Sequence, residues 1–94
     1  MFVITLTYLK PLSEVEKQLP AHREFLKQGY SAGMLLASGP MIPRTGGIIL
    51  ARGNDKNAIL NFLESDPFKK NDIAAYEVVE FDPVLFSDDF AKSI

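Results

Sequence analysis

Four short stretches with the two-residue periodicity of β-strands and two stretches with helical periodicity follow one another along this 94-residue chain. The predicted strands cover residues 2–8, 34–38, 46–51 and 73–81, and the predicted helices cover residues 20–32 and 54–64. The resulting order is β-α-β-β-α-β, which is that of the split βαβ or ferredoxin-like motif. The sequence therefore predicts an α+β protomer with an antiparallel sheet, in a single domain over residues 1–94.

Proline, glycine and short polar residues set the predicted ends of the helices. Pro20 is expected to interrupt a continuous helix, so a separate short turn is predicted before it, with Ser13 and Glu16 as a capping box. The main helix then begins at Pro20 and ends at Gly33. In the second helix Asn54 is the predicted N-cap.

Two helices on one face of a four-stranded sheet leave the other face bare. Five apolar residues are expected on that bare face: Ile4, Leu6, Leu36, Ile49 and Val79. A symmetric homodimer that packs sheet on sheet would cover them, and assembly beyond a dimer stays open. Residues 1–83 form the predicted core. The apolar extension 84–94 is expected to carry a short helix capped by Ser87, and to dock on its own sheet edge or across the dimer.

Composition excludes several classes of function. The net charge is −2 and the ten lysines and arginines are scattered, so we expect no nucleic-acid partner. No apolar run approaches the ~20 residues of a membrane span, and the first residues lack the features of a signal peptide. We therefore expect a cytoplasmic protein that does not bind membranes. One histidine, no cysteine and no nucleotide motif predict neither a metal site nor a cofactor.

His22 is the only histidine, and therefore the first candidate for acid–base chemistry near neutral pH. It lies at helical spacing from Val15, Leu19 and Leu26, which places the imidazole on the apolar stripe of its helix. A carboxylate on one ring nitrogen would fix the tautomer and make the other nitrogen a better base, and Asp66 is the candidate. Two alternatives stay open: a structural histidine with a buried partner, and a turn aspartate that bonds its own backbone before a proline.

Five further residues are candidate contacts to a small molecule. Ser38 offers a hydroxyl, Gly39 and Pro40 bring backbone close to a ligand, Arg44 suits a substrate carboxylate, and Tyr8 can line a pocket. Each also has an ordinary structural explanation, such as a hydroxyl that bonds the backbone or an exposed loop arginine.

Several short motifs together resemble the YCII-related (YciI-like) family. They are the run Leu19 to His22 with its Pro-Ala-His, the stretch Gly33 to Pro40 ending in Ser-Gly-Pro, the Asp-Pro-Phe at residues 66–68, and the strand at residues 76–81. The likeness covers about residues 1–83. It implies a ferredoxin-like protomer in a dimeric α+β barrel related to muconolactone isomerases. It also implies a site built from a histidine and an aspartate, here His22 and Asp66. The apolar extension after Pro83 is longer than the family core requires.

Two functional hypotheses follow. The first is a small homodimeric enzyme in which His22 moves a proton beside a carbonyl and Asp66 orients it, as in lactone isomerisation or elimination, with no metal and no cofactor. The second is a non-catalytic module in which the same barrel holds a small ligand or regulates a partner, with His22 purely structural. The sequence leaves the substrate and the reaction open.

Overall fold

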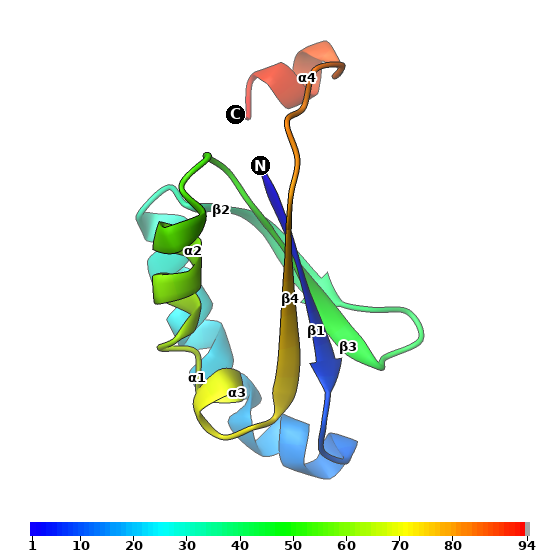
Figure 1. Cartoon of the computed structure of the whole chain (residues 1–94). Coiled ribbons are helices and arrows are strands. Elements are labelled where there is room, and N and C mark those ends of the chain that lie inside the picture. Colours follow the sequence, from blue (N-terminus) through cyan, green and yellow to red (C-terminus); the bar gives the residue numbers. More distant parts are fainter. Residues whose placement is uncertain (94) are drawn as a thin grey trace.

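The computed structural model describes residues 1–93 and has an antiparallel sheet of four strands with the order β2-β3-β1-β4 (Figure 1). The elements in chain order are β1 (Phe2–Tyr8), α1 (Leu12–Ser31), β2 (Leu35–Pro40), β3 (Gly46–Ala51), α2 (Lys56–Leu63), α3 (Pro67–Lys70), β4 (Ala74–Glu80) and α4 (Asp88–Ala91). This confirms the predicted α+β class and the ferredoxin-like order. No helix within residues 1–93 is long and apolar enough to cross a membrane.

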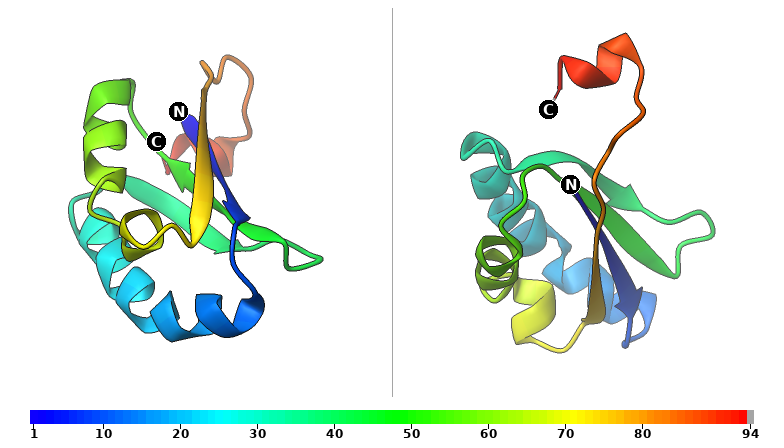
Figure 2. Two further views of the ribbon diagram at one scale, coloured as in Figure 1. Left: turned by 60° about the horizontal axis from the view of Figure 1, so that its bottom comes forward. Right: turned by 45° about the horizontal axis from the view of Figure 1, so that its top comes forward.

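The core lies between one face of the sheet and the helices α1, α2 and α3, which gather on that side in both views of Figure 2. Strand β1 pairs with β3 on one side and with β4 on the other. In this register Ile4 lies opposite Ile49 on β3 and opposite Val78 on β4. Because successive strand residues point to opposite faces, one set of alternate residues is buried under the helices. The fully buried core residues include Phe2 and Ile4 on β1, and Val15, Leu63 and Phe68 on the helices that cover them.

The prediction of a break at Pro20 is wrong, because α1 runs continuously through this residue. A proline inside a helix loses one backbone hydrogen bond and crowds the preceding turn. Here the helix buries side chains on both sides of the proline, Val15 before it and Phe25 after it, and tertiary packing outweighs the local cost. The predicted end is confirmed, since Gly33 follows the helix with a positive φ of 74°.

The N-caps predicted for the first two helices are also wrong. Helix α1 begins after Pro11 without any side-chain cap, so Ser13 lies inside the helix and forms no capping box. In α2 the N-cap is Asp55 rather than Asn54, and its Oδ1 accepts the Ala58 N–H at 3.1 Å. Asn54 and Asp55 are both good N-cap residues, so residue type alone does not show which of them caps the helix. The course of the backbone decides which side chain reaches the free N–H.

The residues assigned to the bare face of the sheet need correction. Ile4, Leu6 and Ile49 lie under the helices, while Val79 is 46% exposed on the other face. Because the side-chain period of a strand is two, choosing the wrong phase moves every residue of that strand to the opposite face. The face that the helices leave uncovered, called the outer face below, instead carries the following apolar residues: Val3, Ile48, Leu50 and Val79.

The C-terminal extension forms the predicted short helix, α4, with Ser87 Oγ accepting the Phe90 N–H at 3.1 Å. In the single chain Val84, Leu85 and Phe86 are exposed, and docking on the edge of the barrel stays a prediction. The extension continues beyond the end of β4, away from the helices (Figure 1), and Leu85 is 92% exposed. Docking across a dimer stays a prediction.

Candidate active site

Asp66 holds the start of the short helix α3, an element that the sequence analysis did not predict. Its Oδ1 accepts the Phe68 N–H at 3.0 Å, and Pro67 occupies the first turn, where a missing N–H costs nothing. The carboxylate is fully buried, with 0% of the residue exposed. Asp66 is therefore the turn aspartate that one alternative expected, but burial requires further partners for its second oxygen and remaining lone pairs.

His22 provides one of these partners from helix α1. Its Nδ1 lies 2.8 Å from Asp66 Oδ1, and only 7% of the residue is exposed. A carboxylate only accepts hydrogen bonds, so the proton of this contact sits on Nδ1 and the neutral ring keeps its lone pair on Nε2. The Phe68 ring stacks on the imidazole with centroids 3.9 Å apart and planes 3° apart, which fixes the ring orientation from one face.

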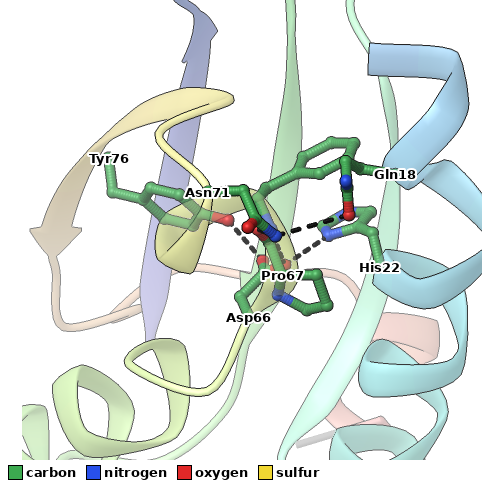
Figure 3. A network of polar contacts seen from close by, with 7 residues as sticks. Gln18, His22, Asp66, Pro67, Asn71 and Tyr76 are labelled. Atoms are coloured by element: carbon green, nitrogen blue, oxygen red, sulfur yellow. Dashed lines mark hydrogen bonds and ion pairs between the residues drawn. The ribbon is translucent and has the colours of Figure 1, made fainter. Parts of the chain in front are cut away.

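Tyr76 on β4 provides the other partner and was missed by the sequence analysis. Its hydroxyl donates to Asp66 Oδ2, so this carboxylate accepts from a tyrosine, a histidine and a backbone N–H (Figure 3). Burial first, then the hydrogen bond to Asp66, and last the negative charge of that carboxylate raise the pKa of Tyr76. The only feature of the sequence that points to Tyr76 is the alternation along β4, which places it among the residues that face the helices. It pairs with Leu6 of β1.

The raised pKa of Tyr76 predicts a loss of stability at alkaline pH. An unfolded tyrosine ionises near pH 10, whereas the folded protein keeps Tyr76 neutral, so its contribution is complete below about pH 10 and declines above it by at most ~1.4 kcal/mol per pH unit. Tyr76→Phe is therefore expected to flatten the decline of the free energy of unfolding above pH 10, measured by urea denaturation. Tyr30→Phe, at a residue that is 40% exposed, is the control and keeps the wild-type slope. Equal slopes for wild type and Tyr76→Phe would contradict this assignment.

A cavity of about 450 Å³ lies between the sheet and α1, and His22 forms part of its wall. Its apolar walls include Leu6, Leu19, Leu26, Ile49 and Phe68. The candidate contacts Tyr8, Ser38, Gly39, Pro40 and Arg44 all border the same cavity. Asp66 does not border it and instead lies behind His22. The arrangement is a mostly apolar chamber with a few polar groups, the usual character of a small-molecule site.

Two polar contacts join residues of the cavity wall to side chains on helix α1. Ser38 Oγ lies 2.6 Å from the Tyr30 hydroxyl on α1, so this serine bonds a side chain rather than the backbone of its own strand. Arg44, in the loop between β2 and β3, donates from Nη1 to Glu16 Oε1 on α1 at 2.5 Å. Glu16 first, and the Tyr8 hydroxyl second, raise the pKa of Arg44 above its ordinary value, so its guanidinium is charged. Neither Glu16 nor Tyr30 was predicted as a site residue, because their partners Arg44 and Ser38 lie on other elements.

Comparison with known proteins gives three findings. A search of curated proteins finds no match. Among solved structures, the chain is similar to the 5-chloro-2-hydroxyhydroquinone dehydrochlorinase of Burkholderia phenoliruptrix in complex with 2,5-dihydroxybenzoquinone. The TM-score is 0.70 at 19% sequence identity, and the match covers 87% of this chain and 94% of that one, a likeness that establishes the fold. The family model of the YCII-related domain matches residues 1–82, so the chain belongs to the YCII-related domain family.

Proposed function

We propose that the protein catalyses proton transfer on a small organic substrate, with His22 as the base or acid and Asp66 as its positioning residue. The observation that carries the proposal is the 2.8 Å contact between His22 Nδ1 and the fully buried Asp66 carboxylate, at the wall of a cavity large enough for a single-ring molecule. A neutral histidine with a fixed Nδ1–H tautomer exchanges protons through Nε2 near neutral pH.

The reaction begins with a C–H bond beside a carbonyl group of the substrate. His22 Nε2 takes this proton, and the electron pair of the C–H bond moves toward the carbonyl oxygen to form an enolate. The imidazolium that forms is stabilised by the Asp66 carboxylate, which Tyr76 and the Phe68 N–H hold in place. The enolate then takes the proton back at another carbon, which is isomerisation, or expels a leaving group with its bonding electrons, which is elimination.

The similar dehydrochlorinase supports the elimination form of this chemistry. Its name describes the loss of HCl from a chlorinated hydroxyhydroquinone, and its bound molecule is a single six-membered ring. A molecule of this kind suits the size of the cavity and its apolar walls in the present chain. We therefore place cyclic enolisable compounds, with or without a leaving group, first among the substrates to be tested.

The decisive experiment measures proton transfer directly. The protein is incubated in D2O with cyclic ketones, lactones and hydroxyquinones, and the loss of C–H signals beside the carbonyl is followed by ¹H NMR. Chloride release from 5-chloro-2-hydroxyhydroquinone is measured in parallel. We expect exchange or chloride release with the wild type, and a fall of about 100-fold or more in His22→Gln, because the group that carries the proton is removed. Asp66→Asn is expected to lower the rate by a smaller factor.

The matched control for this experiment is Arg52→Gln, at an exposed loop residue that does not border the cavity. It is expected to keep the wild-type rate. A His22→Gln variant that retains full activity would contradict the proposed role. Binding of the test compounds without any exchange or chloride release would favour the second hypothesis, a non-catalytic ligand-binding module.

The proposal includes a homodimer formed through the outer face of the sheet. Four apolar side chains, Val3, Ile48, Leu50 and Val79, lie on this face, and α1, α2 and α3 all cover the opposite one. A second copy placed sheet against sheet would remove these side chains from water at both surfaces at once. Sedimentation equilibrium, which reports the molar mass in solution, tests this assembly.

A further inference from the structure

The ion pair between Arg44 and Glu16 marks a second polar point on the cavity wall, separate from the His22–Asp66 contact. Arg44 is 34% exposed and Glu16 is 53% exposed at the side chain, so both remain accessible from the solvent side. Arginine carries five N–H donors; Nη1 donates to Glu16 Oε1, and the Tyr8 hydroxyl lies beside the same guanidinium. Its Nε is buried and has no hydrogen-bond partner among residues 1–93. The guanidinium is therefore held in place but has unused donors.

The spacing of Glu16 and His22 along α1 gives the distance between this ion pair and the candidate base. Glu16 and His22 are six residues apart on one continuous helix, and a rise of 1.5 Å per residue separates them by about 9 Å along the helix axis. Both border the cavity, and Leu19 lies between them on its wall. A distance of this size accommodates one six-membered ring with a polar group bonded at one end and a reacting carbon at the other.

We propose that Arg44 recognises a carboxylate of the substrate, so that the substrate class is a small, single-ring or similarly short carboxylic acid. This inference rests on the proposed function and specifies its substrate. Glu16 already presents a carboxylate oxygen to the guanidinium, and the carboxylate of a ligand can make the same kind of charge-assisted hydrogen bond. Phosphate monoesters fit less well, because the negative charge of Glu16 beside the guanidinium opposes a dianion more strongly than a monoanion.

The pairing with Glu16 also affects how strongly the site binds an anionic ligand. The glutamate holds the guanidinium at the cavity wall, but its own negative charge opposes an incoming anion. Removing that charge while keeping the side-chain shape is expected to strengthen carboxylate binding. Removing the guanidinium is expected to abolish the preference for an anion over a neutral molecule of the same size.

The experiment compares benzoate with benzyl alcohol, a neutral molecule of similar shape, by ¹H–¹⁵N NMR titration at millimolar concentrations. In the wild type we expect benzoate to shift the signals of residues around His22 and Arg44, with an affinity at least about tenfold above that of benzyl alcohol. Arg44→Gln is expected to bring benzoate to the level of benzyl alcohol. Glu16→Gln is expected to raise the benzoate affinity several-fold and to leave benzyl alcohol unchanged.

Arg23 also borders the cavity and provides the matched control. Arg23→Gln is expected to retain most of the preference for benzoate. The proposal is overturned if benzoate does not bind, if both probes bind equally to the wild type, if Arg44→Gln keeps the preference, or if Arg23→Gln removes it. Deuterium exchange that depends on His22, without any effect of Arg44→Gln, would overturn this proposal alone. A benzoate preference that depends on Arg44, without any proton transfer, would overturn the catalytic proposal alone.

Discussion

Replacing Asp66 by alanine is expected to lower the free energy of unfolding by about 3–5 kcal/mol. The fully buried carboxylate accepts hydrogen bonds from His22 Nδ1, the Tyr76 hydroxyl and the Phe68 N–H. Alanine offers no acceptor, so three donors are left in a site from which water is excluded, and each unsatisfied buried group costs about 1–3 kcal/mol. The N-cap of α3 disappears in the same substitution.

Urea denaturation measures this loss, and the chain offers a matched control. Asp55 also caps a helix through one hydrogen bond, but it is exposed and its partner is the Ala58 N–H alone. Asp55→Ala is therefore expected to cost only about 1 kcal/mol, the ordinary value of an N-cap. Equal costs at the two positions would show that the buried network contributes no more than a simple cap. In Asp66→Ala, the ¹⁵N signals of His22 should also lose the Nδ1–H tautomer that the carboxylate imposes.

Gly46→Ala is expected to destabilise the sheet by more than about 3 kcal/mol and to leave little folded protein. Gly46 is the first residue of β3, and a Cβ at this position would overlap the backbone carbonyl of Leu6 on β1. A backbone atom cannot move to another rotamer, so the two strands would have to separate where Gly46 pairs with Thr7. Because β1 and β3 both carry core side chains, this separation reaches the hydrophobic core.

The control for this substitution is Gly39→Ala on the neighbouring strand β2. A Cβ at Gly39 would meet no atom within 4 Å, so the expected change in the free energy of unfolding lies within about 0.5 kcal/mol. Thermal and urea denaturation of the two variants provide the comparison. A Gly46→Ala variant as stable as Gly39→Ala would contradict the close approach of the two strands.

Local periodicity and turn chemistry were sufficient to predict the order of the four strands and the two longer helices. The alternation in residues 2–8, the apolar stripe around residues 58–63 and the glycine at position 33 each act within a few residues, and each was confirmed. The chemistry of the candidate pair was also visible in the sequence, because a single histidine on an apolar helix face needs a buried partner. His22 Nδ1 lies 2.8 Å from Asp66 Oδ1, and the role of the two residues as a catalytic pair stays a proposal.

Tertiary structure alone decided the features that depend on neighbours distant in the sequence. Pro20 remains inside a helix because the packing of side chains before and after it outweighs the free-energy cost of a proline in a helix. Only that local cost can be read from the sequence. Tyr76 and Glu16 complete the site because strand β4 and helix α1 bring them to Asp66 and Arg44, and no spacing along the chain records either contact. Periodicity determines that a strand has two faces, but only the assembled sheet determines which face meets the helices.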